Sequence, residues 1–474
     1  MTVARDRLAP QERRASLAAP MYRLAGTPIT VALGLLNTAI VVRETGAAVF
    51  GLVALVAAVT LLFPFADLGI GASVISASAR LRGPNADPAA ADVVRRGFRV
   101  LFGVAGAVVG VAVVIMSLDG WATVIGFASG PQDRWAVTVA VCLFGLTLPA
   151  GLGVRILIGI DRNPLATVVL MSCPAFALGL TLLLFSARVD GIWYVTSSLG
   201  GLLAGQLLGC VLALSLSGLG SSAFSPVRGA STGTPLLAGS MWLFVVGMGL
   251  PIGLQTGRVI LAHLSTPEQL AEYALLAQMY AACWSVLSAA GLAYWPIFVR
   301  RRAETAETIA MWRRLTTSFG ALAALAAAAL WLLGPWAAEV LSGGEIEVTA
   351  WLALAFGALL IGQAMHLPAT VLLTLPAEAR WQALWTIVMA VASIGLGCAV
   401  APRYGAAGVV VAAALAIFVA QVVPALIWVP ELVRRRRPSD EVRVSSPAAR
   451  RRSHPDPRRE SQSHWLRPSL RRGG

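Results

Sequence analysis

Between residues 21 and 430 the chain is a succession of long apolar runs separated by short polar segments. A helix needs about 20 residues to cross ~30 Å of hydrocarbon, and each run has a length of that order. Barrel strands would instead show about ten residues of alternating polarity, so these runs predict helices. The twelve runs cover residues 21–42, 47–78, 98–118, 135–158, 164–187, 191–217, 236–262, 271–298, 315–341, 350–375, 380–401 and 406–430.

The composition excludes a soluble globular protein. Hydrophobic residues make up 57% of the chain and charged residues only 13%, where about 25% charged is usual. The sequence contains no lysine. A G-x-x-x-x-G-K-[ST] nucleotide loop and a lysine Schiff base are therefore both excluded. We expect any uphill transport to use an ion gradient or a partner protein.

No cofactor or metal is expected. The five cysteines all fall inside apolar runs and form no C-x-x-C pair, so they are interpreted as small core residues. The four histidines show no metal-binding spacing.

The arginines predict the orientation. If the N-terminus is cytoplasmic, only Arg43, Arg134, Arg188 and Arg403 face outward and Arg258 lies within a span, while all other arginines face the cytoplasm. The positive-inside rule therefore favours cytoplasmic N- and C-termini. The net charge of +14 then belongs mostly to an inner shell that faces anionic inner-leaflet lipids. No nucleic-acid partner is expected.

The same features divide the chain into segments. We expect a basic cytoplasmic arm at 1–20, a six-helix lobe at 21–217, a cytoplasmic linker at 218–235 and a second six-helix lobe at 236–430. The tail at 431–474 is rich in Arg, Pro and Ser and should be disordered. It is either a solvated, lipid-attracted tail or a docking site for glycan-assembly enzymes in the cytoplasm or membrane.

Two stretches half a chain apart look alike. Residues 50–54, FGLVA, match residues 273–277, YALLA, and each stretch leads to an inner arginine cluster. The offset corresponds to about six spans, and an even number of spans preserves orientation. The sequence thus predicts an all-α polytopic membrane protein of about twelve transmembrane helices, in two parallel, pseudo-symmetric six-helix lobes around a central cavity.

At this point the sequence resembles a known family. Phe50-Gly51 and the stretch ADLGIG at 66–71 fill the places of the second-span signature of polysaccharide flippases. These O-antigen and teichoic-acid exporters belong to the MOP superfamily, together with the MATE transporters. A second similarity lies at 251–298, although Gly257 stands where the family often has aspartate. The matching residues there are Gln255, Arg258, Tyr273, Ala277 and Trp295-Pro296.

The resemblance covers residues 21 to about 430. It implies movement of an undecaprenyl-diphosphate-linked oligosaccharide from the inner to the outer leaflet of the bacterial cytoplasmic membrane, for cell-surface polysaccharide biosynthesis. It also implies alternating access through a V-shaped cavity, no ATP site and no enzyme activity.

Asp67 is a lone carboxylate inside an apolar run. Burying it in hydrocarbon costs about 3 kcal/mol on insertion scales, so we expect it to face a cavity or a partner, or to be protonated. Pro64, Gly69 and Gly71 suggest a broken helix. Its free backbone amides would donate hydrogen bonds to the Asp67 carboxylate. A coupling or gating role and pairing between lobes are the alternatives.

Arg258 lies more than a turn inside a span. Either it snorkels outward, or it meets the lipid diphosphate in the cavity, because guanidinium groups suit phosphate geometry. Arg43 is a candidate of the same kind, at the end of the first run. Asn37 and Gln255 are candidate sugar-binding groups, or they join helices by hydrogen bonds. His366 precedes Pro368, so it is either a packing contact at a kink or a coupling group.

Other functions make different demands on the sequence. A MATE-type cation-coupled drug or metabolite antiporter would need acidic groups in its cavity. A membrane glycosyltransferase or polymerase would need catalytic outer loops, and the outer loops here are short. A lipid II flippase usually has additional spans, and a non-transporting scaffold would share all these features.

Overall fold

The computed structural model describes residues 10–60, 70–81, 88–126, 130–225, 237–301 and 304–436. All regular structure in these ranges is helical. Asp67 lies outside the described residues, as does the tail beyond Arg436.

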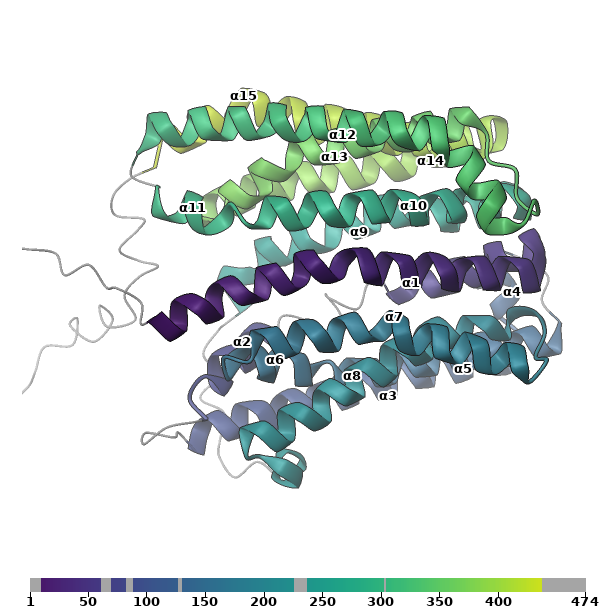
Figure 1. Ribbon diagram of the computed structural model, residues 1–474, viewed down its shortest axis with the longest axis horizontal. Coiled ribbons are helices and arrows are strands. Elements are labelled where there is room, and N and C mark those ends of the chain that lie inside the picture. Colours follow the sequence, from purple (N-terminus) through teal and green to yellow (C-terminus); the bar gives the residue numbers. More distant parts are fainter. Residues whose placement is uncertain are drawn as a thin grey trace, which may run out of the picture.

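The helices form a bundle with one long axis (Figure 1). We refer to residues 10–225 as the first half and to 237–436 as the second half. The first half contains α1 (Pro10–Ala57), α2 (Ile70–Ser78), α3 (Pro88–Ser117), α4 (Trp121–Ile125), α5 (Pro131–Ala150), α6 (Leu152–Gly159), α7 (Asn163–Ser186) and α8 (Val195–Ser217). The second contains α9 (Leu237–Leu264), α10 (Pro267–Leu292), α11 (Trp295–Arg300), α12 (Thr305–Ser342), α13 (Ala350–Leu372), α14 (Pro376–Ile417) and α15 (Val423–Arg434), with a π-helical turn at Phe418–Val422.

By length and composition, ten stretches of the described chain could cross a membrane. Two of them, Gly26–Thr60 and Glu378–Arg434, are interrupted by a glycine in a left-handed conformation. Gly46 has φ 73° and Gly405 has φ 53°. Glycine adopts this conformation without a Cβ penalty, so each glycine joins two helices without a longer loop. Both fall between apolar runs that the sequence separates.

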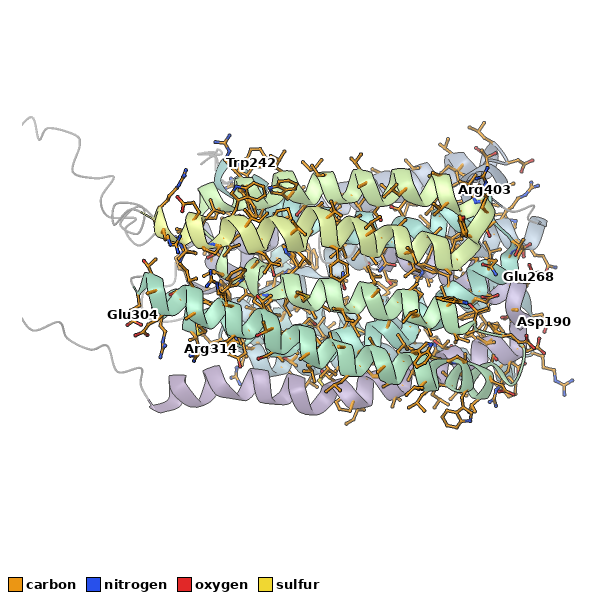
Figure 2. All side chains as sticks on the ribbon, turned by 90° about the horizontal axis from the view of Figure 1, so that it is seen from above. Asp190, Trp242, Glu268, Glu304, Arg314 and Arg403 are labelled. Carbon is orange, nitrogen blue, oxygen red and sulfur yellow. The ribbon has the colours of Figure 1, made fainter. Side chains whose placement is uncertain are left out.

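The surface is that of a membrane protein. The charged residues labelled in Figure 2 lie at its two ends, with Glu304 and Arg314 at one and Asp190, Glu268 and Arg403 at the other. Between the ends, large apolar side chains are exposed, for example Leu325 at 70% and Val391 at 66%. A continuous apolar surface of this kind is stable in lipid and not in water.

Contacts between the two halves gather at one end of the bundle, which we call the closed end. Gly51 packs there on α10 so closely that a Cβ added to it would lie 3.1 Å from the Pro267 carbonyl oxygen. His263 Nε2 lies 3.1 Å from the carbonyl oxygen of Thr123. Arg43 donates a 2.6 Å hydrogen bond to the Val340 carbonyl. The closed end is on the right in Figure 1.

The buried apolar residues form three cores. The largest draws on both halves and includes Phe50, Leu261 and Leu270 near the closed end. At the opposite end each half has a core of its own: one contains Phe98 and the other contains Trp312. The halves therefore share a core at the closed end and pack separately at the other.

Local signals fix where α10 begins, and this helix carries much of the site. The Thr266 side chain accepts a hydrogen bond from the Gln269 amide at 3.4 Å, and Pro267 occupies the first turn. A threonine cap followed by proline is a strong helix start. It places the first turn of α10 beside Gly51, and the rest of the helix then runs along the interior.

Candidate functional site

A cavity of about 780 Å³ lies between the two halves. Residues of α1, α7 and α8 line it from the first half, and residues of α9, α10, α13 and the π-helical turn line it from the second. A cavity at the interface of two structural halves is the usual position of a transported ligand.

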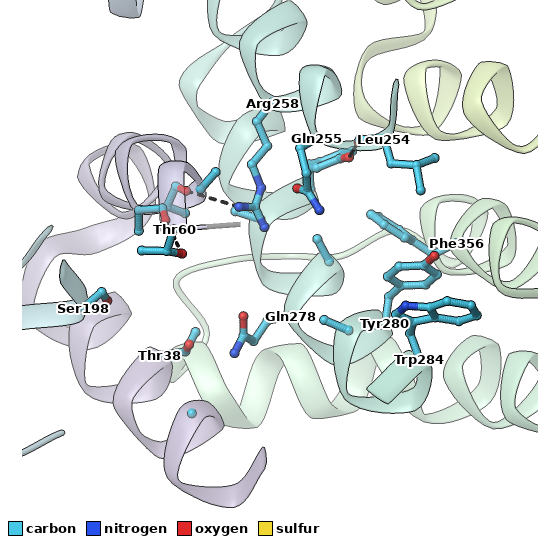
Figure 3. Close-up of a pocket in the computed structure, with 18 of the residues that line it drawn as sticks. Thr38, Thr60, Ser198, Leu254, Gln255, Arg258, Gln278, Tyr280, Trp284 and Phe356 are labelled. Carbon is cyan, nitrogen blue, oxygen red and sulfur yellow. Dashed lines mark hydrogen bonds between the residues drawn. The ribbon is translucent and has the colours of Figure 1, made fainter. Parts of the chain in front are cut away.

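Arg258 supplies the charge in this cavity. Its side chain projects from α9, is 9% exposed and donates a 3.3 Å hydrogen bond to the Ala54 carbonyl of α1 (Figure 3). Its Nε has no hydrogen-bond partner in the described part of the chain. The described lining residues include no aspartate or glutamate. The guanidinium therefore has unused donors and no neutralising carboxylate among them.

Amide side chains lie close to this guanidinium. Gln255 projects from the preceding turn of α9, and Gln278 approaches from α10 across the cavity (Figure 3). Asn37 lines the first-half wall, where its Oδ1 accepts a 2.6 Å hydrogen bond from Thr181. The Asn37 amide donors stay available for a ligand.

The opposite wall combines aromatic rings with neutral polar groups. Tyr280 donates a hydrogen bond to the Gln363 side chain. His366 of α13 and Gln421 of the π-helical turn line the same cavity, as does Trp284, one turn beyond Tyr280. We call Tyr280, Trp284, Gln363, His366 and Gln421 the polar–aromatic wall.

Some groups of this wall lack partners. Within the described chain, the Oε1 of Gln421 has no hydrogen bond, and the His366 ring lies beside the Gln421 backbone without a well-aligned one. His366 is 5% exposed and Gln421 is 1% exposed. An unpaired buried polar group costs about 1–3 kcal/mol. The adjacent π-helical turn is a distortion that is often found at functional sites.

The structure brings four of the six sequence-predicted residues to this cavity, namely Arg258, Gln255, Asn37 and His366. Arg43 does not line it, because its guanidinium reaches the Val340 carbonyl at the closed end. Asp67 lies outside the described residues.

Sequence reasoning missed Tyr280 and Trp284 as site residues. Aromatic residues in an apolar run are indistinguishable from core residues by composition. One signal was available. Tyr273, Tyr280 and Trp284 are spaced by seven and four residues, which places them on one face of a helix. Tyr273 and Tyr280 do pack on one ring, Phe356, at centroid distances of 5.2 and 5.4 Å.

The described lining suits an anionic ligand that also carries hydroxyl groups. One guanidinium can pair with phosphate oxygens, and neutral amides and hydroxyls can bind hydroxyls as donors and acceptors. Among the residues that the structure describes, no group of three His, Cys, Asp or Glu side chains could hold a metal ion.

Comparison with known proteins identifies a family. Residues 20–302, more than half of the chain, match the family described as polysaccharide biosynthesis protein. No curated protein matches the chain.

Solved structures share the fold at low sequence identity. An inward-facing multidrug resistance MATE family transporter of the MOP superfamily superposes with a TM-score of 0.65 at 13% identity, covering 90% of this chain and 100% of that chain. The lipid II flippase MurJ, in an inward closed conformation, gives 0.62 at 10% identity and 90% coverage of each chain. A MOP superfamily transporter from Pyrococcus furiosus gives 0.56 at 13% identity, covering 89% of this chain and 96% of that chain.

These superpositions show that the chain shares the fold of these transporters. The family match covers most of the first half and reaches through α9 and α10, which carry Arg258 and Trp284. The chain belongs to the polysaccharide biosynthesis protein family, and it is a multi-pass membrane protein with the fold of MOP superfamily transporters.

Proposed function

We propose that the protein is a flippase for an undecaprenyl-diphosphate-linked oligosaccharide. It moves the lipid-linked glycan across the bacterial cytoplasmic membrane, from the inner to the outer leaflet, for the assembly of a cell-surface polysaccharide. One observation carries the proposal. Arg258 is the only residue with a permanent charge among the described residues that line the cavity.

Charge favours this function over a cation antiporter. A site for organic cations needs carboxylates, and the described lining has none. In a low-dielectric cavity a buried guanidinium attracts an anion strongly. Arg258 retains unpaired donors, and a diphosphate offers acceptor oxygens in the matching geometry.

The neutral amide side chains of the cavity suit the hydroxyl groups of a glycan. Gln255, Gln278 and Asn37 are neutral and border the same space, so they bind hydroxyls without adding charge. The cavity is large enough for a headgroup, since ligand pockets usually measure about 300–1,000 Å³. The polyprenyl chain would stay in the lipid while the headgroup enters between the two halves.

We propose the topology that the sequence predicts. Counting the arms on either side of Gly46 and Gly405 as separate crossings favours twelve spans in two six-helix lobes. Cytoplasmic termini then put the closed end on the outer side of the membrane. The shared core at the closed end and the separate cores at the other favour an inward-open state. Inner arginines such as Arg99, Arg313 and Arg314 would face anionic lipids.

The cellular test is deletion of the gene, followed by analysis of lipid-linked glycans in sealed cells. We expect complete oligosaccharide on undecaprenyl diphosphate to accumulate in the inner leaflet. The wild-type gene should clear it. Arg258→Gln should fail to do so, because the amide is neutral and cannot pair with the diphosphate.

Arg188→Gln is the matched control, because Arg188 is exposed at the end of α7 and does not line the cavity. It should clear the intermediate as the wild type does. Full-length intermediates that reach the outer leaflet and stay unpolymerised would instead indicate a polymerase. A deletion strain with no lipid-linked intermediate would contradict the flippase assignment.

A further inference from the structure

We propose that the polar–aromatic wall is a glycan subsite, separate from the anion site at Arg258, that binds the sugars nearest the diphosphate. This inference rests on the proposed function and adds to it a place where sugar is recognised. Its five residues come from α10, α13 and the π-helical turn, all in the second half.

These residues converge at one depth. Trp284, His366 and Gln421 each lie about 16 residues along a helical arm that starts at the closed end, at Pro267, Ala350 and Gly405 respectively. At a rise of 1.5 Å per residue, all three are about 24 Å from that end. Tyr280 and Gln363 lie one turn nearer to it and are hydrogen-bonded to each other. Three elements distant in sequence thus contribute to the cavity wall at nearly the same depth.

The anion site lies closer to the closed end. Arg258 is six residues before Leu264, where α9 ends at the closed end, or about 9 Å deep. The difference of about 15 Å places the wall beyond the guanidinium in the direction of the separate cores. A diphosphate held by Arg258 therefore directs its attached sugars along the cavity toward this wall.

The chemistry of the wall matches a pyranose ring. One face of a sugar ring is apolar and can pack on an aromatic face, while its rim carries hydroxyls that both donate and accept. Trp284 and Tyr280 provide the aromatic surface, and Gln363 fixes the Tyr280 hydroxyl. None of the five wall residues carries a carboxylate, so the wall has no negative charge to repel the adjacent diphosphate.

The unpaired atoms point to a missing ligand. The Oε1 of Gln421 has no partner in the described chain, and the His366 ring lies beside the Gln421 backbone without a well-aligned hydrogen bond. The other end of the Gln421 amide is held, because its Nε2 donates to Thr386 at 3.2 Å. The unpaired oxygen is therefore fixed at one place in the wall. Sugar hydroxyls would supply the donors and acceptors that these atoms lack.

A binding measurement on the purified full-length protein tests this subsite. Two probes are compared: undecaprenyl diphosphate without sugar, and undecaprenyl diphosphate carrying an N-acetylhexosamine disaccharide. We expect the wild type to bind the disaccharide lipid about tenfold more tightly. Trp284→Ala should bind both lipids equally, with the affinity for the sugar-free lipid unchanged. Gln421→Ala should reduce the preference several-fold.

The controls separate recognition from folding. Trp284→Tyr should recover most of the sugar preference, because it restores an aromatic face. Trp351→Ala should match the wild type, since Trp351 is 75% exposed at the closed end of α13. Arg258→Gln should weaken the binding of both lipids and leave their ratio unchanged.

The outcomes distinguish the two proposals. Equal binding of both lipids by the wild type would overturn the glycan subsite and leave the anion site intact. A Trp284→Ala protein that keeps the tenfold preference, or that loses affinity for both lipids in parallel, would also overturn the glycan subsite. A wild type that binds neither lipid would overturn the proposed function, and the subsite with it.

Discussion

Arg43 and Val340 are 297 residues apart in the sequence, yet the Arg43 guanidinium donates a 2.6 Å hydrogen bond to the Val340 carbonyl. The bond joins α1 of the first half to α12 of the second. Gly343 covers the same guanidinium, because its Cβ position is 3.3 Å from the Arg43 Nε. Arg43 therefore acts in this state as a tie between the halves at the closed end and not as a cavity residue.

Arg43→Ala should weaken the closure of this end. The reporter is Ser198→Cys in a protein whose five native cysteines are replaced by alanine, because Ser198 lines the cavity. A membrane-impermeant maleimide added to intact cells should label this cysteine several-fold faster in Arg43→Ala. Arg403→Ala, at an exposed arginine of the same end, is the control. Unchanged labelling in Arg43→Ala would remove this role.

Gly51 should tolerate no large side chain. A Cβ added at Gly51 would lie 3.1 Å from the Pro267 carbonyl oxygen and 3.2 Å from the Ala271 amide nitrogen. The backbones of the two halves are therefore in close contact here. Gly51→Leu should wedge the closed end apart and raise labelling of the Ser198→Cys reporter. Overpacking of this kind costs about 1–3 kcal/mol.

Gly106→Leu is the matched control for that wedge. Gly106 is also helical, and nothing lies within 4 Å of its Cβ position. Its labelling rate and expression should equal those of the parent protein. A Gly51→Leu protein that is equally unaffected would show that the halves do not meet at this glycine.

Arg436 and Glu378 form a buried ion pair that should stabilise the second half. Their side chains are 10% and 5% exposed, and Arg436 Nε lies 2.6 Å from Glu378 Oε1. Arg436→Ala leaves a buried carboxylate without its cation, at a cost of about 3–5 kcal/mol. We expect a fall of several degrees in the unfolding temperature of the detergent-solubilised protein.

The exposed pair between Arg435 and Glu431 provides the comparison. Its side chains are 75% and 46% exposed, and such surface pairs contribute about 0–1 kcal/mol. Arg435→Ala should therefore change the unfolding temperature by less than the measurement error. Equal effects of the two alanine variants would contradict the importance of burial.

The membrane helices were predictable because hydropathy is a strong constraint. A span requires a long uninterrupted apolar segment, and the ten candidate spans of the described chain all fall on apolar runs of the sequence. The turns at Gly46 and Gly405 do not divide the helices when spans are counted by helix length. Each consists of a single left-handed glycine, so one continuous helical stretch covers two apolar runs that the sequence separates.

The cavity was predictable only where polarity stood out. Arg258, Gln255, Asn37 and His366 are polar residues in apolar runs, and each lines the cavity. The spacing of Tyr280 and Trp284 puts them on one face of α10, but nothing local marks whether that face packs in a core or lines a cavity. Arg43 is at the end of its run, where the sequence does not reveal whether a side chain turns inward or toward a neighbouring helix.

Reconstitution tests the central claim most directly. Proteoliposomes are loaded in one leaflet with the undecaprenyl-diphosphate-linked oligosaccharide, and its arrival in the other leaflet is measured with an enzyme that acts only from outside. The account predicts that wild-type protein moves the lipid much faster than protein-free liposomes do, and that Arg258→Gln abolishes the gain. Wild-type vesicles that move it no faster than empty ones, while exchanging organic cations for protons, would contradict the account.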